Sequence, residues 1–150
     1  MHTADTKTAP TAADIALVRQ SFDLIVPISG VAADLFYDRL FYLAPSLRGM
    51  FPADMRDQKR KLMVMLAAAV HGLTDLDTLA PKLMELGARH AGYGVKDEHY
   101  KVVGEALIWT LERGLGAAWT QELAAAWAAA YATLSQFMIA EAYGRSAAAE

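Results

Sequence analysis

The sequence predicts an all-α protein with a single domain, and three observations support this prediction. Alanine, the strongest helix former, supplies 30 of the 150 residues. Apolar side chains recur at steps of three and four residues in several segments, which is helical spacing. No segment alternates β-branched and polar residues as a half-buried strand does. The length is sufficient for one sizeable hydrophobic core.

The first helix is indicated by its start. Residues Thr11–Asp14 have the pattern of a capping box, and apolar residues follow at helical spacing as far as Val26. Pro27 and Gly30 then interrupt the pattern, so we predict a second helix at about residues 29–42.

Two prolines mark the next irregular segment. Pro45 and Pro52 bracket a short corner that carries Phe51. A helix at about residues 55–71 is predicted after it, because the apolar periodicity resumes there and Gly72 stops it.

Three more helices complete the chain. We predict a short helix at about 79–90, with Pro81 tolerated in its first turn. Paired glycines separate it from a helix at about 97–113, and further glycines separate that helix from a last one at about 120–143. The domain would span 11–144.

The two ends of the chain and one uncharged segment need separate interpretation. Residues 1–10 and 145–150 are predicted to be disordered tails. Residues 123–140 carry no charge, which approaches the length of a membrane-spanning helix. Alanine dilutes this segment, and its large side chains follow helical spacing, so we interpret it as a buried helix of a globular protein without a membrane span.

Composition excludes several classes of function. The chain has no cysteine, which excludes disulfides, thiolate metal sites, thioether-linked cofactors and cysteine nucleophiles. The net charge of −3 gives no electrostatic footprint for nucleic acid or for an anionic membrane. No signal peptide is visible in the polar first ten residues, and we expect a cytoplasmic protein.

Among the histidines, His90 is the candidate metal ligand. Leu79, Leu83 and Leu86 precede it at steps of 4, 3 and 4, so the imidazole continues an apolar stripe. One interpretation is a core histidine with a satisfied hydrogen bond. The other is a neutral imidazole whose Nδ1–H donates to a carbonyl near Leu86, leaving Nε2 free for a metal. The remaining histidines are expected in the N-terminal tail or on the surface: His2, His71 and His99.

Two further polar side chains lie in apolar surroundings. Gln58 heads an apolar face of its predicted helix, either reaching solvent or donating a hydrogen bond to a ligand. Tyr37 lies in an apolar run and could add a phenol to the same cavity, although core tyrosines are common. No metal cage or phosphate loop motif accompanies them. A metal held by one histidine needs a prosthetic group with its own ligands, and haem is such a group.

The chain resembles the bacterial single-domain globins related to the flavohaemoglobin haem domain and to neuroglobin. The resemblance covers about residues 12–143 in unbroken order. It rests on these pieces: Leu35-Phe36-Tyr37, Leu40-Phe41, Pro45, Phe51, Gln58-Lys-Arg-Lys-Leu62-Met63, Leu86-Gly-Ala-Arg-His90, Gly94-Val95, Tyr100, Val103-Gly104-Glu105, Trp127 and Tyr131.

The resemblance implies a globin fold, a three-on-three helical sandwich around non-covalent haem b. His90 would be the proximal iron ligand, Phe51 would stack on the porphyrin and Val95 would pack at its edge. Leu62 would be the apolar residue over the iron, and Lys61 would pair with a propionate.

On the two sides of the haem, the resemblance implies further roles. Tyr37 and Gln58 would donate hydrogen bonds to a ligand on the distal side. Tyr100 corresponds to a tyrosine that orients the proximal histidine together with a glutamate. Glu141 falls one residue short of the expected spacing for that glutamate, where Ala142 stands.

The function implied is reversible binding of dioxygen, and of carbon monoxide and nitric oxide, at a five-coordinate iron for transport or storage. The alternative is an enzyme, a nitric oxide dioxygenase that uses an external reductase for detoxification. The same site residues would serve both functions.

Overall fold

Six α-helices and three short 3₁₀ turns make up the part of the chain that the structure describes. In the computed structural model this part is residues 9–149, with side chains described for residues 9–139. The helices are α1 (Ala12–Ile25), α2 (Ser29–Leu43), α3 (Arg56–Gly72), α4 (Leu76–Gly92), α5 (Asp97–Leu115) and α6 (Gln121–Ala149). The 3₁₀ turns are Val26–Ile28, Pro45–Met50 and Gly116–Ala118. Residues 9–149 contain no strand, which confirms the all-α prediction.

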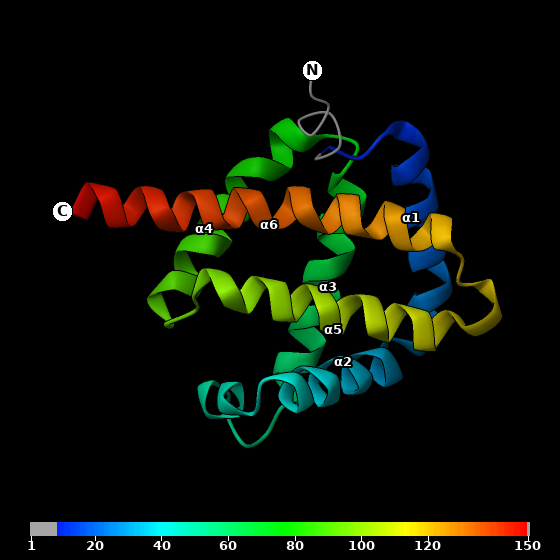
Figure 1. The fold of residues 1–150 in the computed structure, drawn as a ribbon, viewed down its shortest axis with the longest axis horizontal. Helices are drawn as coiled ribbons and strands as arrows, with labels where there is room; N and C mark the ends of the chain where they lie inside the picture. Colours follow the sequence, from blue (N-terminus) through cyan, green and yellow to red (C-terminus); the bar gives the residue numbers. More distant parts are fainter. Residues whose placement is uncertain (1–8, 150) are drawn as a thin grey trace.

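The helices cross in layers around a shared core (Figure 1). α6 packs most extensively against α4 and also covers α1, while α2 packs on α5. α3 contacts α1, α2 and α4, and α5 lies beside α6. The packing of α6 on α1 and α4 therefore joins segments that are distant in the sequence. The consecutive helices α3 and α4 are also in contact.

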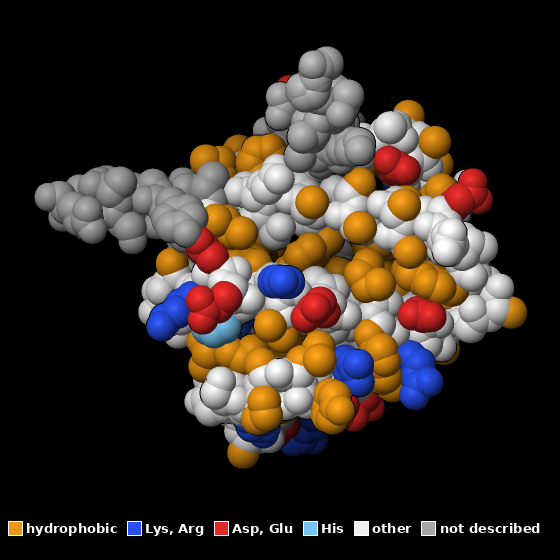
Figure 2. Space-filling view, viewed as in Figure 1, with side chains coloured by type: hydrophobic (Ala, Val, Ile, Leu, Met, Phe, Trp, Pro, Cys, Tyr) orange, Lys and Arg blue, Asp and Glu red, His pale blue; other side chains and the backbone are white. Residues whose placement is uncertain are grey.

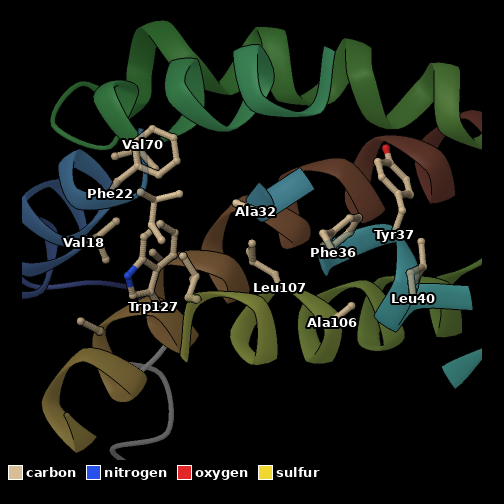
Figure 3. Packing of buried hydrophobic residues seen from close by; sticks show 14 of the residues in the cluster. Val18, Phe22, Ala32, Phe36, Tyr37, Leu40, Val70, Ala106, Leu107 and Trp127 are labelled. Atoms are coloured by element: carbon tan, nitrogen blue, oxygen red, sulfur yellow. The ribbon is translucent and has the colours of Figure 1, made fainter. Parts of the chain in front are cut away.

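The largest buried side chain is Trp127 of α6, which is 2% exposed. Its indole N–H donates to the Ser21 hydroxyl of α1 at 2.9 Å. Figure 3 shows Val18, Phe22 and Val70 gathered around the indole. This cluster fixes α1 and α3 against α6, because side chains of all three helices meet in it.

The predicted start of α1 is confirmed at the level of single hydrogen bonds. The Asp14 N–H donates to the Thr11 hydroxyl, and the Thr11 N–H donates to the Asp14 carboxylate, each at 3.0 Å. These reciprocal bonds form a capping box, which satisfies two N–H groups that the first turn leaves unpaired.

The start of α4 was predicted three residues too late. The Asp75 carboxylate accepts from the Thr78 N–H and hydroxyl, so the helix begins at Leu76. Pro81 consequently lies in the second turn instead of the first. A proline there has no N–H for the Asp77 carbonyl, an interruption that the packing of α4 on α6 outweighs.

The end of α6 also differs from the prediction. The helix continues to Ala149, six residues beyond the predicted end at Tyr143 and through most of the predicted tail 145–150. Three consecutive alanines at 147–149 favour continued helix, and no proline follows Tyr143 to stop it. Residues 1–8 of the other predicted tail lie outside the described residues.

The uncharged segment 123–140 is packed, as predicted, but only on one side. Leu123, Trp127 and Ala130 are buried, whereas Ala125 and Ala128 face outward. The middle of α6 therefore carries no charged side chain on the face seen in Figure 2, while α5 below it carries both signs.

One stretch of the described residues, Ala12–Leu43, is long and apolar enough to cross a membrane. The stretch is not one straight helix, because the 3₁₀ turn Val26–Ile28 separates α1 from α2, which run in different directions in Figure 1. Its apolar residues Val18, Phe22 and Phe36 belong to the core. Other apolar residues of the stretch are exposed, among them Leu24, Val26 and Val31.

Candidate functional site

The imidazole of His90 has the hydrogen bond that the sequence predicts. Its Nδ1 lies 2.8 Å from the carbonyl oxygen of Leu86, one turn earlier on α4. A carbonyl only accepts, so Nδ1 carries the proton, and Nε2 is the ring nitrogen left for a metal. Tyr93 and Val95 in turn donate their N–H groups to the His90 carbonyl, each at 3.0 Å.

The other described histidines are in the surroundings that the sequence predicts. His71 is exposed on the last turn of α3. The His99 Nδ1 accepts from the Lys96 N–H at 2.9 Å, where it helps to close the first turn of α5.

Tyr37 and Gln58 meet between α2 and α3. The Gln58 side-chain amide donates to the Tyr37 hydroxyl at 3.1 Å, and Tyr37 is 4% exposed. Gln58 thus points to the tyrosine, which excludes the interpretation that its amide merely reaches solvent. An ion pair between Lys59 and Asp34, at 2.9 Å, ties the same two helices together beside this bond.

Burial sets the protonation of Tyr37. Removal from water raises the pKa of the hydroxyl, and the hydrogen bond from Gln58 lowers it by a smaller amount. The phenol therefore remains protonated, and able to donate, throughout the neutral range.

Phe51 is held against Tyr37 by the corner between α2 and α3. Its ring meets the Tyr37 ring edge-on with centroids 5.6 Å apart, and the Phe41 ring at 5.5 Å. The Arg48 guanidinium donates to the carbonyls of Phe51, Pro52 and Ala53 at 3.3, 3.0 and 3.3 Å. Sequence reasoning missed Arg48; the available signal was a lone arginine in a proline-bracketed segment whose carbonyls lack helical partners.

Leu62 and Lys61 are consecutive residues of α3 that point to different faces, Leu62 inward and Lys61 to solvent. Leu62 lines a small apolar cavity of about 10 Å³ together with Phe36 and Trp127. A space that size holds about one water-sized molecule, and its apolar walls keep it dry. Lys61 is exposed, and its ammonium lies 3.2 Å from Asp57, so the structure does not bring Lys61 to the other site residues.

Tyr100 lies beside His90, with the two ring centroids 6.4 Å apart. Its hydroxyl is buried and has no partner among the side chains that the structure describes. The Tyr131 hydroxyl donates to the Tyr100 carbonyl at 2.6 Å. The side chains of Glu141 and Ala142, where the sequence leaves the proximal network undecided, lie outside the described residues.

Burial of Tyr131 should make the fold sensitive to alkali. Burial raises the pKa of its hydroxyl well above the ordinary value, and Tyr100 adds to the rise. The unfolded chain loses this proton from about pH 10, whereas the folded chain keeps it. The contribution of the protonated Tyr131 hydroxyl to the free energy of unfolding is therefore fully present below pH 10. Above pH 10 it falls, by at most about 1.4 kcal/mol per pH unit for one group.

The check is urea unfolding of the wild type and Tyr131→Phe between pH 8 and about pH 11. We expect a lower free energy of unfolding for the variant at pH 8, because the bond to Tyr100 is lost. Above pH 10 we expect a shallower fall for the variant. Parallel falls would contradict the assignment to Tyr131.

The donor set is suited to a metal that brings its own ligands. In the described part of the chain no group of three or more His, Cys, Asp or Glu side chains could hold a metal ion. His90 offers one free ring nitrogen, and the unpaired Tyr100 hydroxyl beside it is an exception among buried polar atoms, which are normally paired. One nitrogen ligand that continues the apolar stripe of Leu79, Leu83 and Leu86 fits haem.

Comparison with known proteins agrees with this fit. The globin family model matches residues 34–138. A neuroglobin from Tetraodon nigroviridis is 30% identical over an alignment of 135 residues, and the match covers 81% of this chain and 85% of the relative. A neuroglobin from Danio rerio is 30% identical over an alignment of 139 residues, and the match covers 83% of this chain and 87% of the relative.

Solved structures share the fold. A bacterial globin from Campylobacter jejuni has a TM-score of 0.79 at 20% identity, covering 89% of this chain and 97% of that one. A flavohemoglobin from Malassezia yamatoensis, solved with bound FAD and heme, has a TM-score of 0.77 at 17% identity. The match covers 91% of this chain and 37% of the flavohemoglobin. These structural matches confirm the predicted globin fold. The family model and the neuroglobin relatives support haem as the cofactor and show that the chain belongs to the globin family.

Proposed function

We propose that the protein binds dioxygen reversibly, with His90 as the proximal ligand of the haem and Tyr37 and Gln58 as the distal hydrogen-bond donors. Ferrous haem supplies an iron atom with an open coordination position at which a diatomic gas binds. The observation that carries the proposal is the bond from the Gln58 amide to the Tyr37 hydroxyl, at 3.1 Å.

This bond determines which proton is available. The Tyr37 oxygen has one proton and two lone pairs, and the Gln58 amide uses a lone pair. The hydroxyl proton is thus left for another acceptor. Because burial raises the pKa of Tyr37, that proton stays in place at neutral pH. Tyr37 is therefore the principal donor, and the Gln58 amide fixes the position of the Tyr37 hydroxyl oxygen.

Such a donor favours dioxygen over carbon monoxide. A hydrogen bond is stronger to the more polarised acceptor, and dioxygen bound to ferrous haem is more polarised than carbon monoxide. Gln58 has no imidazole with which to compete for the iron, so we propose a five-coordinate resting state. A six-coordinate low-spin ferrous spectrum without added ligand would contradict this.

The remaining residues have supporting roles in the proposal. Phe51, Leu62 and Val95 supply apolar surface that excludes water from the haem. The Tyr100 hydroxyl, unpaired among the described side chains, is available to fix the proximal imidazole. Lys61 would reach a propionate only by leaving Asp57, which an exposed ion pair permits at little cost. We place the protein in the cytoplasm, where reductants keep haem ferrous.

The experiment is the dioxygen dissociation rate of the wild type, Tyr37→Phe and Gln58→Leu. Loss of a hydrogen bond worth about 1–3 kcal/mol should speed release by roughly fivefold to 150-fold. Tyr37→Phe should have the larger effect, and carbon monoxide release should change less. Tyr42→Phe is the matched control, since Tyr42 lies on the same helix with 72% of its surface exposed. Unchanged rates in both variants would refute the donor assignment.

The same pocket would serve nitric oxide dioxygenation if a reductase restored the ferrous state. Mixing the oxygenated protein with nitric oxide and a reductase separates the two functions. We expect a single stoichiometric burst. Sustained turnover would replace the binding proposal with the enzymatic one.

A further inference from the structure

Two helix backbones come unusually close where α4 crosses α6. Gly87 is buried there, and a Cβ atom built on it would press against the carbonyl oxygen of Met138, 2.6 Å from its Cα and 2.7 Å from its carbonyl carbon. Real Cβ atoms essentially never approach within 3.0 Å of another heavy atom. The obstructing atoms are backbone in the interior of α6, so no side-chain rotation could relieve the contact. α4 reaches this position only because residue 87 has no side chain.

The contact lies within one turn of the proximal histidine. The Leu86 carbonyl, which accepts from His90 Nδ1 at 2.8 Å, belongs to the peptide group shared with Gly87. Positions 87 and 90 are three residues apart, which places them on neighbouring faces of the helix. A displacement at Gly87 therefore carries both the imidazole and the carbonyl that orients it.

α6 is the principal support of this part of α4. The α4–α6 packing is the most extensive between any two helices of the described chain, whereas the contact of α4 with α3 is slight. In a tightly packed interior, a change in one helix separation is transmitted instead of being absorbed locally. The packing of α4 on α6 therefore determines where His90 lies.

We propose that Gly87 is a positioning residue for the proximal ligand. By letting the α4 backbone rest on Met138, it sets where the His90 Nε2 lies with respect to the haem. The inference rests on the proposed ligation by His90.

The test is Gly87→Ala, read by resonance Raman spectroscopy of the ferrous protein. The added methyl group should move α4 from α6 by more than about 1 Å, because its 2.6 Å approach to the Met138 Cα must widen to an ordinary contact of 3.4–4 Å and the Met138 carbonyl oxygen lies closer still. We expect the iron–histidine stretching band to shift. The carbon–oxygen stretch of the carbon monoxide complex, which reports the distal donors, should stay in place. Haem transfer to an acceptor apoglobin should accelerate by at least about tenfold.

Two other glycines provide matched controls. Gly92→Ala adds the same methyl group to the same helix, but nothing lies within 4 Å of that position. Gly114→Ala makes a close contact elsewhere, with the flexible end of Ile25 at 2.9 Å, between α5 and α1. Both should leave the iron–histidine band unchanged, even where Gly114→Ala lowers the melting temperature.

A stabilised background guards against failure to fold. Gly30 lies in α2 with nothing within 4 Å, so Gly30→Ala improves helix propensity without a clash. Gly87→Ala is made in this background and in the wild type, and a crystal structure measures the shift of α4.

The outcomes separate the inference from the proposed function. The ligation itself would be overturned if the wild type had no iron–histidine band, or if the band persisted unchanged in His90→Gly. A wild-type band that persists unshifted in Gly87→Ala, or an α4 that does not move, would overturn the role of Gly87 while leaving the ligation intact.

Discussion

Replacing His90 with glycine is expected to abolish the stable binding of haem in its five-coordinate ferrous form. His90 is the one histidine of the described chain placed in an apolar stripe with Nδ1 bonded to a carbonyl, and neither His71 nor His99 offers an equivalent imidazole. Titration of the apoprotein with haem should show affinity reduced by at least a hundredfold, about 2.7 kcal/mol. Added imidazole should restore the five-coordinate spectrum by occupying the space left by the side chain.

The control is His71→Gly. It places glycine in a helix at an exposed histidine, and therefore matches the cost of about 0.5–1 kcal/mol that glycine imposes on helix stability. Its haem titration should resemble that of the wild type. Equal loss in both variants would mean that helix stability, and not ligation, governs haem binding.

Replacing Trp127 with alanine is expected to have the largest effect on the fold. The side chain is 2% exposed and joins α1 to α6 through its bond to Ser21. Truncation of a buried tryptophan costs roughly 3–5 kcal/mol, a large fraction of the 5–15 kcal/mol typical of a domain. Urea unfolding followed by far-ultraviolet circular dichroism measures this loss without depending on the fluorescence of the removed indole.

Two further variants separate packing from hydrogen bonding at this position. Trp127→Phe keeps an aromatic ring but removes the N–H, and Ser21→Ala leaves the N–H without an acceptor. Each should cost about 1–3 kcal/mol, less than the alanine variant. Trp119→Ala, at a half-buried tryptophan, serves as the comparison. A loss below about 1 kcal/mol for Trp127→Ala would contradict the central role of this side chain.

Features set by neighbouring residues could be predicted from the sequence. The capping box at Thr11 and Asp14 depends on residues three apart, and the bond from His90 to Leu86 on residues four apart. Helical geometry alone determines both contacts. The start of α4 was missed for a local reason as well, because Pro81 was given the place of a first-turn proline although Asp75 already caps the helix.

Features that join distant parts of the chain were harder to predict. Tyr37 and Gln58 are 21 residues apart, and only the resemblance to globins placed them on one side of the haem. Gly87 carries no local signal at all, since its importance arises from the backbone of Met138, 51 residues later. Such contacts depend on how helices cross, which periodicity does not encode.

The hydrogen bonds that Arg48 donates to the corner between α2 and α3 have a consequence for sequence variation among related proteins. All three of its bonds there are to main-chain oxygens, of Phe51, Pro52 and Ala53. Main-chain oxygens are present whatever the residue, so the side chains at positions 52 and 53 are free to drift while the loop keeps its path. The conformation of this loop therefore depends on one side chain, that of Arg48. Arg48 must be included when the loop is grafted onto another protein.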